Sequence, residues 1–387
     1  MCGIVGYIGG EQAAPILLEG LSRLEYRGYD SAGVAVFDGQ TGSLAVRKAK
    51  GRLQVLSDQL HGGADLDSTA GVGHTRWATH GAPSDVNSHP QVSRSGKIAV
   101  VHNGIIENYA ELKAFLMNQG VSFTSETDTE VVAQLIEYFY DGDLLQAVGR
   151  VLHRIQGAYA LGILCAGCPD QIIAVRKDSP LILGYGEGCN FIASDVTAIL
   201  RHTRRVGYME DGELAVLTRE GIQCYNHLMQ PIEKEVATVD WEIDAAEKGG
   251  YEHFMFKEIM EQPEALRRCL SPRIREREIV FEDFSLSEKY IKSMRRIYIV
   301  ACGSSYHVGM VGKYHLERLT RVPVEVALGS EFRYMDPIVD EHTLVIVISQ
   351  SGETLDTMAA LREASRLGGH ILSIVNVVGS SIARESD

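Results

Sequence analysis

The sequence lacks long apolar runs and concentrated positive charge, and both absences narrow the range of functions. No stretch of the 387 residues approaches the ~18–20 apolar residues that a membrane helix needs, so we expect no membrane association. The chain also starts without the basic residues and sustained apolar core of a secretory signal. The formal net charge is −14, and basic clusters are short, as at 201–205. Because phosphate backbones attract concentrated basic surfaces, we expect no nucleic-acid partner.

Cysteine is scarce as well, and its placement argues against a disulfide framework. The seven cysteines are odd in number and scattered, at Cys2, Cys165, Cys168, Cys189, Cys224, Cys269 and Cys302. Without an export signal, this usage indicates a reducing cytoplasm. Cys165 and Cys168 have the C-x-x-C spacing, but no second pair accompanies them. A structural pair of thiols is therefore favoured over a metal or redox site.

The second residue is the most informative position in the chain. Once Met1 is removed, Cys2 carries both a thiol and a free α-amine. An α-amine titrates near ~7.7–8.0 in model compounds, so at neutral pH it can take the thiol proton without a histidine. The apolar, glycine-spaced run that follows predicts a strand that would hold the terminus in place. From the first residues alone, a chance cysteine after the initiator methionine is the alternative.

The hydrophobic pattern divides the chain into three regions. Residues 2–225 contain many short strands, with a hairpin around a Gly-Gln-Thr-Gly turn, and three helices. This mixture indicates an α+β layered domain. The helices are expected after Pro15, through 108–119 and from Thr127, where Thr127 and Glu130 have the spacing of a capping box.

The second and third regions differ from the first. Residues 226–285 are interpreted as a linker with one amphipathic helix, which carries Phe256, Ile259 and Met260 on one face before Pro263. Residues 286–387 alternate unbroken apolar strands with helices, which is typical of buried parallel strands in a βαβ arrangement. The chain stops where a further helix should form, so we expect this domain to be incomplete.

A cysteine nucleophile needs an oxyanion hole and a means of holding its substrate. Asn103 and Gly104, at the end of a predicted strand, offer an amide donor and a backbone N–H, although an Asn-Gly pair also suits a plain hairpin turn. Arg76 suits a carboxylate and Asp128 an ammonium group, so together they would hold both ends of an α-amino acid. The alternatives are an ordinary ion pair for Arg76 and a favourable first-turn charge for Asp128.

Four histidines in this domain raise the question of a metal. They are His74, His80, His89 and His102. Their spacings fit no common zinc pattern, and a cysteine with its own amine needs no metal. We therefore expect neither a metal nor an organic cofactor.

Five segments of the first region carry a family resemblance. CGIVGYIG, LEYRGYDSAG, HTRWATHG, HNGIIEN and SETDTE occur in this order within the first 130 residues. They resemble the signature segments of class II, N-terminal-nucleophile glutamine amidotransferases. The resemblance implies a four-layer αββα fold and hydrolysis of L-glutamine to glutamate and ammonia. It also implies that Cys2 is nucleophile and base, that Asn103 and Gly104 form the oxyanion hole, and that the glutamine site includes Arg76, Trp77, Thr79, His80, His89 and Asp128. Trp77 matches a residue that gates the ammonia route in one branch of the family.

The third region has hydroxyl-rich segments after two predicted strands. In open α/β sheets, ligands bind at the carboxyl ends of strands, and a helix N-terminus favours a phosphate. Simple N-caps are the alternative, which is weaker for two such segments than for one. Neither segment matches a Walker P-loop, so nucleotide hydrolysis is not expected. The candidate phosphate contacts are Cys302, Gly303, Ser304, Ser305, Ser349, Gln350, Ser351 and Thr354.

These segments resemble the sugar isomerase (SIS) domain, a doubly wound α/β fold with a parallel sheet. With a glutaminase domain before it, the whole chain resembles glutamine-dependent aminotransferases that convert fructose 6-phosphate into glucosamine 6-phosphate. The resemblance implies a homodimer at full length. Family members have a second SIS half that carries a lysine and the acid–base groups of the isomerisation. We therefore expect this chain alone to hydrolyse glutamine without making glucosamine 6-phosphate.

Three other interpretations stay open from the sequence. Another class II amidotransferase, such as a phosphoribosyl enzyme, would share Cys2 but carry a different second domain. A stand-alone glutaminase would have the same first domain without an acceptor. A sugar-phosphate sensor would bind the sugar without releasing ammonia, and would have no need of Cys2, Arg76, Asn103 and Asp128 together.

Overall fold

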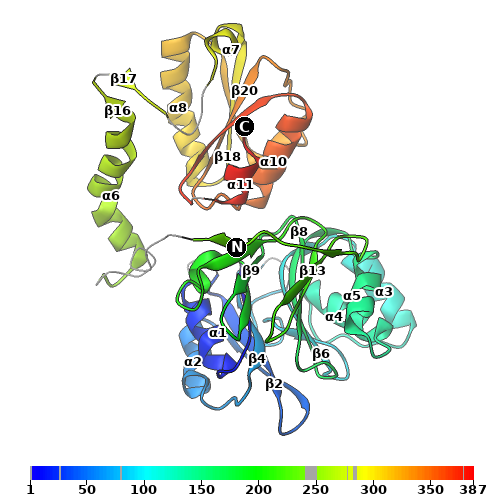
Figure 1. Cartoon of the computed structure of the whole chain (residues 1–387). Coiled ribbons are helices and arrows are strands. Elements are labelled where there is room, and N and C mark those ends of the chain that lie inside the picture. Colours follow the sequence, from blue (N-terminus) through cyan, green and yellow to red (C-terminus); the bar gives the residue numbers. More distant parts are fainter. Residues whose placement is uncertain are drawn as a thin grey trace. The chain divides into compact units, whose positions relative to one another are not determined.

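The structure is a computed structural model that describes residues 2–25, 28–78, 81–239, 251–276, 278–281, 286–377 and 379–387. It divides into two compact units, Met1–Gly249 and Gly250–Asp387 (Figure 1). Each unit has its own sheets and its own hydrophobic core.

The first unit is built on two antiparallel sheets. One has eight strands in the order β15-β11-β9-β10-β1-β4-β2-β3, and the other has seven in the order β14-β13-β12-β8-β7-β6-β5. The strands of the first sheet are β1 Gly3–Ile8, β2 Ser31–Asp38, β3 Ser43–Lys50, β4 Ala70–Arg76, β9 Ile182–Tyr185, β10 Asn190–Ala193, β11 Arg205–Tyr208 and β15 Ala237–Thr238. Those of the second are β5 Gln91–Val92, β6 Ile98–Ile106, β7 Gly157–Cys165, β8 Ile172–Lys177, β12 Leu214–Leu217, β13 Ile222–Tyr225 and β14 Pro231–Ile232.

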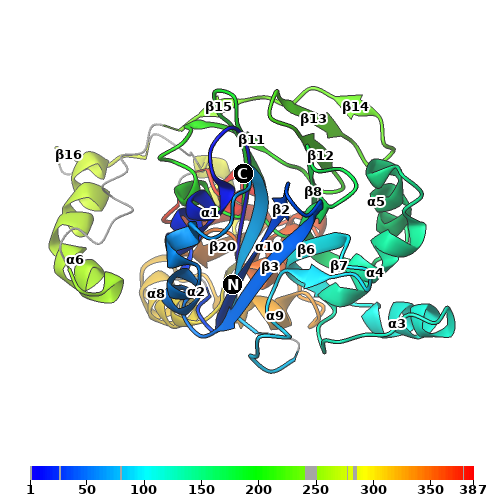
Figure 2. The same ribbon diagram turned by 90° about the horizontal axis from the view of Figure 1, so that it is seen from below.

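Helices cover the outer face of each sheet, which gives four layers (Figure 2). On the eight-stranded sheet lie α1 Ala13–Ser22 and α2 Leu53–Gln59, and on the seven-stranded sheet lie α3 Tyr109–Asn118, α4 Thr129–Phe139 and α5 Leu144–Leu152. One hydrophobic cluster fills the space between each sheet and its helices, and a third fills the space between the sheets. The four-layer αββα fold expected from the sequence is confirmed.

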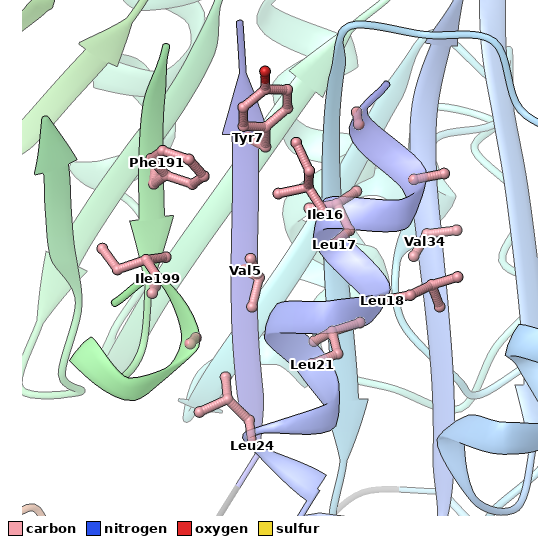
Figure 3. Close-up of a cluster of buried hydrophobic side chains, with 14 of the residues drawn as sticks. Val5, Tyr7, Ile16, Leu17, Leu18, Leu21, Leu24, Val34, Phe191 and Ile199 are labelled. Carbon is pink, nitrogen blue, oxygen red and sulfur yellow. The ribbon is translucent and has the colours of Figure 1, made fainter. Parts of the chain in front are cut away.

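Strand β1 shows why the residues between the glycines at the start of the sequence are apolar. It lies inside the eight-stranded sheet, between β10 and β4, and all six of its residues are buried. Val5 and Tyr7 pack against α1 (Figure 3). Ile4 and Ile8 instead belong to the core between the sheets. Burying each such side chain contributes roughly 1.5–3 kcal/mol. The strand that begins after Cys2 is therefore anchored on both faces.

Local details depart from the sequence-based expectations at two helix starts. The first helix begins at Ala13, so Pro15 lies inside its first turn, where an N–H is not required. The third begins at Thr129 and not at Thr127, and the expected capping box is absent. Glu130 instead accepts hydrogen bonds from the backbone N–H groups of Thr124 and Ser125, because the preceding loop folds back over the helix start. The hairpin around residues 39–42 is confirmed by the pairing of β2 with β3.

The second unit contains a four-stranded parallel sheet in the order β19-β18-β20-β21. Its elements are α7 Glu288–Ser293, β18 Arg296–Ala301, α8 Ser304–Thr320, β19 Val324–Leu328, α9 Gly329–Phe332, β20 Thr343–Ser349, α10 Leu355–Arg366, β21 His370–Val375 and α11 Ser381–Glu385. Hydrophobic clusters lie on both faces of this sheet. The expected doubly wound α/β fold is confirmed.

The segment interpreted as a linker contains regular structure at both of its ends. Strands β14 and β15 extend the sheets of the first unit beyond residue 225. Helix α6, Phe254–Leu270, precedes a small hairpin of β16 Ile274–Arg275 and β17 Glu278–Ile279. The helix passes through Pro263 instead of ending before it. None of the helices in the described ranges is both long and apolar enough to cross a membrane.

Candidate active site

Cys2 lies at the entrance to β1, beside the end of β4. Gly3 pairs with Thr75, so the thiol reaches the peptide that follows Arg76. The backbone N–H of Trp77 donates to Cys2 Sγ at 3.2 Å. Burial raises the pKa of the Cys2 thiol, while the Trp77 N–H and the Arg76 charge act in the opposite direction. The thiol therefore needs a nearby base before it can act as a nucleophile.

A short loop before β2 holds the Trp77 backbone in place. The backbone N–H of Ala78 donates to Asp30 Oδ2. Gly28 lies close to the backbone of Arg76, and a Cβ there would be 2.8 Å from the Arg76 carbonyl carbon. The indole of Trp77 is 47% exposed and makes an edge contact with Tyr29, with ring centroids 5.3 Å apart. Trp77 thus contributes its backbone to the thiol and leaves its ring at the surface.

Asn103 and Gly104 lie on β6, in the other sheet, and Asn103 contacts Cys2. Its Nδ2 donates to the Cys2 carbonyl at 3.1 Å, and its Oδ1 accepts from His74 Nε2 at 3.0 Å. Gly104 has φ +125, and a Cβ there would lie 2.0 Å from the Ala158 carbonyl oxygen. The Asn-Gly pair is therefore part of a long strand, and the hairpin-turn alternative is wrong.

The charged residues expected to bind glutamine are buried. Arg76 donates from Nη2 to the Gly81 carbonyl at 3.3 Å. Asp128 Oδ2 accepts from the Ile106 N–H at 2.8 Å and lies 3.9 Å from His102 Nδ1. Asp128 precedes α4, and its bond to β6 fixes it on the strand that carries Asn103.

His89 takes part in a buried network of histidines and a hydroxyl. Its Nε2 lies 2.8 Å from Thr129 Oγ1, and the same hydroxyl lies 2.8 Å from His102 Nδ1. The His89 ring also packs on the ring of His74, with centroids 4.4 Å apart. Burial lowers the pKa of His89 well below its usual range, and that of His74 to about 3. Both rings are neutral at physiological pH.

Two of the expected glutamine contacts, Thr79 and His80, lie outside the described residues. Conversely, sequence reasoning gave no role to His74, His102 or Thr129, which join the expected residues in space. The two histidines had been considered only as metal ligands. Within the described ranges, no group of three or more His, Cys, Asp or Glu side chains is arranged to hold a metal. The available sign of a role for His74, His102 and Thr129 was that each lies inside one of the five segments that carry the family resemblance.

The arrangement in the first unit is suited to attack on a carbonyl-type carbon. It places a thiol, an amide N–H donor and a buried guanidinium close to one another. An amide N–H held near the nucleophile can stabilise the negative oxygen of a tetrahedral intermediate. The guanidinium and the Asp128 carboxylate offer opposite charges for a zwitterionic substrate.

In the second unit, the hydroxyl-rich segments lie at neighbouring strand ends. Ala301 pairs with Ile348, so the segments that follow β18 and β20 are adjacent. Thr357 Oγ1 donates to Cys302 Sγ at 3.4 Å, which connects α10 to the end of β18. The residues placed together here are Cys302, Gly303, Ser304, Ser305, Ser349, Gln350, Ser351 and Thr354.

The hydroxyls of these segments are not used as helix caps. Neither α8 nor α10 has a side-chain capping bond, so the simple N-cap alternative is wrong. Ser349 Oγ accepts from the Gly352 N–H at 3.0 Å, and Ser351 Oγ accepts from the Glu353 N–H at 3.2 Å. These bonds shape the loop, while Ser304 stays exposed at the start of α8.

Two family models match the chain. The glutamine amidotransferase domain matches residues 74–201, and the SIS domain matches residues 290–387. The chain is 55% identical over its whole length to a glutamine–fructose-6-phosphate aminotransferase [isomerizing] of Caldanaerobacter subterraneus subsp. tengcongensis, and 53% identical to one of Clostridium tetani. In both cases the chain spans 63% of the relative's length.

A solved structure supports the fold independently. The glutamine phosphoribosylpyrophosphate amidotransferase of B. subtilis, complexed with ADP and GMP, matches with a TM-score of 0.54. The match covers 97% of this chain and 81% of the other, at 20% identity. At that level of identity, the likeness concerns the fold alone.

Proposed function

Because the chain joins a glutamine amidotransferase domain to a SIS domain and is homologous throughout to named aminotransferases, we propose that it carries out the glutaminase step of a glutamine–fructose-6-phosphate aminotransferase (isomerizing). The observation that supports this most directly is the hydrogen bond from Asn103 Nδ2 to Cys2, which brings an amide donor from one sheet to the thiol-bearing residue of the other.

The proposed chemistry proceeds through a thioester. After removal of Met1, the α-amine of Cys2 takes the thiol proton, and the thiolate attacks the side-chain amide carbon of glutamine. Asn103 and Gly104 stabilise the resulting oxyanion. The C–N bond breaks, and ammonia leaves with the proton from the α-ammonium group. Water then attacks the thioester, which releases glutamate and restores the thiol.

Binding of glutamine in this proposal uses the two buried charges. Arg76 pairs with the substrate carboxylate and Asp128 with its α-ammonium group, so the side-chain amide is directed toward Cys2. Trp77, Thr79, His80 and His89 complete the glutamine site. Since a thiolate is required, we place the reaction in the cytoplasm, where thiols stay reduced. None of these steps requires a metal or an organic cofactor.

The acceptor in this proposal is fructose 6-phosphate, held through its phosphate at the SIS unit. The match to a SIS domain favours a sugar phosphate over a phosphoribosyl acceptor. Hydroxyls and backbone N–H groups from the ends of β18 and β20 supply hydrogen bonds without adding charge. Transfer of ammonia to the sugar through a water-poor route, and homodimer formation, are proposed for the whole protein.

The test is release of glutamate from L-glutamine by the purified chain, with intact mass confirming that Met1 is absent. We expect release by the native chain and none by Cys2→Ala, while an exposed-cysteine control, Cys269→Ala, behaves like the native chain. Equal release by Cys2→Ala, or no release by the processed native chain, would refute the proposal. Fructose 6-phosphate binding, measured by calorimetry on native and Ser349→Ala chains, tests the second unit separately.

A further inference from the structure

The ring of His74 lies between the two sheets of the first unit and contacts the proposed oxyanion donor. His74 belongs to β4, where it pairs with Ile4 on one side and Gly33 on the other, and it is fully buried. Its Nε2 lies 3.0 Å from the His102 carbonyl oxygen and 3.0 Å from Asn103 Oδ1, both on β6. The ring therefore bridges the sheets beside Cys2.

The backbone carbonyl of His102 determines which nitrogen of His74 carries the proton. A carbonyl oxygen can only accept a hydrogen bond, so Nε2 must be the donor. Because burial lowers the pKa of His74 to about 3, the ring is neutral and has a single N–H. Nδ1 is then unprotonated, and it has no hydrogen-bond partner among the described residues.

This tautomer in turn determines the orientation of the Asn103 amide. The atom of Asn103 that faces a donating Nε2 has to be the acceptor, Oδ1. Nδ2 then points the other way, where it donates to the Cys2 carbonyl at 3.1 Å. The orientation thus follows from a main-chain carbonyl that has only one possible role. A flipped amide would face His74 with N–H against N–H and would turn its oxygen toward Cys2.

We infer that His74 is a positioning residue, which keeps Asn103 Nδ2, and not Oδ1, on the side of Cys2, where the oxyanion would develop; this inference rests on the proposed function. With its amide flipped, Asn103 would present the lone pairs of Oδ1 to the negative oxygen of the tetrahedral intermediate. The free-energy barrier to that intermediate would then rise. Packing supports the assignment, because the His89 ring lies against the His74 ring, with centroids 4.4 Å apart, and occupies the space on that side of it. His89 is itself held by Thr129.

Two substitutions at His74 distinguish the effect of its Nε2–H from the effect of its ring. His74→Phe keeps a ring against His89 but has no donor, and we expect kcat for glutamate release to fall roughly 100-fold, the effect of losing one oxyanion donor. KM should change less than about twofold, because glutamine contacts are retained. His74→Gln has an amide N–H at the reach of Nε2, and we expect it to stay within roughly fivefold of the native kcat.

A double-mutant cycle with Asn103→Ala tests whether His74 acts through Asn103. Without the Asn103 amide, adding His74→Phe should change kcat less than about threefold, because nothing is left to position. An equal loss of kcat in both backgrounds would overturn the inference. Loss of activity in His74→Gln as large as in His74→Phe would overturn it as well. If His74→Phe fails to fold by circular dichroism, His74→Asn, which is too short to reach Asn103, replaces it in the cycle.

A matched control and the native chain distinguish the two levels of the argument. His202 is also in the first unit and stacks on Phe191, with centroids 5.3 Å apart, so His202→Phe controls for replacing a stacked histidine. We expect it to leave kcat unchanged. If the native chain releases no glutamate, the proposed function fails. If the native chain is active and the cycle is additive, only the role of His74 fails.

Discussion

Burial keeps two histidines near the candidate site neutral, and this gives the fold a pH dependence. His74 titrates at about 3 in the folded chain, and His89 also titrates well below its ordinary pKa, which is near ~6.5 when the chain is unfolded. Between those values the unfolded chain binds more protons than the folded one. The stability contribution is therefore complete above pH ~6.5 and is lost as the pH falls toward 3.

We expect the urea midpoint of the first unit to fall steadily between pH 6.5 and 4. His74→Gln removes one of these two histidines. Its free energy of unfolding should therefore fall less steeply with decreasing pH, by up to about 1.4 kcal/mol per pH unit. Identical slopes for His74→Gln and the native chain would show that His74 does not titrate as expected.

A lysine on β3 supports the loop that carries His89. Lys48 Nζ donates to the Val86 carbonyl at 2.9 Å and to the Pro90 carbonyl at 3.3 Å, and burial lowers its pKa to about 8. We expect Lys48→Met to raise KM for glutamine roughly tenfold with little change in kcat, because the loop loses two bonds while the thiol is untouched. Steady-state kinetics of Lys48→Met and of the exposed Lys50→Met would test this. A drop in kcat at native KM would contradict it.

At the scale of elements, β6 makes a strict demand at Gly104. A Cβ there would lie 2.0 Å from the Ala158 carbonyl oxygen of β7, at a φ of +125 that side chains rarely adopt. We expect Gly104→Ala to displace the strand end, to destabilise the unit by roughly 2–4 kcal/mol and to abolish glutamate release.

Gly120→Ala provides the comparison for Gly104→Ala. Gly120 also has a positive φ, +80, but nothing lies within 4 Å of its hypothetical Cβ. Its cost should be about 1 kcal/mol, with native activity. Thermal unfolding and glutamate release, measured for both variants, would separate backbone strain from collision with β7. Similar behaviour of the two variants would contradict the expected collision.

Elements could be predicted from the sequence where one local signal dominates. Strand β1 and the β2–β3 hairpin follow from apolar periodicity and turn residues, and both are present. The capping box failed because Glu130 has other partners, the N–H groups of Thr124 and Ser125, which compete with the helix start. A spacing rule cannot detect such competition, because it depends on how the preceding loop folds back.

At the scale of the whole molecule, the proposed glutaminase machinery is confined to one unit. Cys2, Arg76, Asn103 and Asp128 all lie in Met1–Gly249, which has three hydrophobic clusters of its own. We expect a truncated protein of residues 1–249 to fold cooperatively and to release glutamate with kcat/KM within roughly threefold of the 387-residue chain. Loss of folding or activity on truncation would show that the second unit supports the first.

The same scale limits what sequence reasoning could find in the site. Arg76 and Trp77, which lie within one segment, were assigned to the candidate site from their motif, and that assignment stays a prediction. The contact of His74 with Asn103 spans 29 positions and two different sheets, so it exists only because the sheets stack face to face. No local pattern encodes that stacking distance. The histidine spacings raised only the question of a metal, which they did not fit, and they gave no indication that His74 contacts Asn103.

The central position of β1 has a practical consequence for handling the protein. Strand β1 pairs with β4 from Gly3 onward and with β10 from Val5 onward, so Cys2 directly precedes a strand that is held on both sides. A purification tag fused to Cys2 would convert its α-amine into an amide, and the proposed base of the reaction would then be lost. A protease that cuts directly before Cys2 would then switch the proposed activity on at a chosen moment. Cleavage at the amino end would thus control when the proposed activity begins.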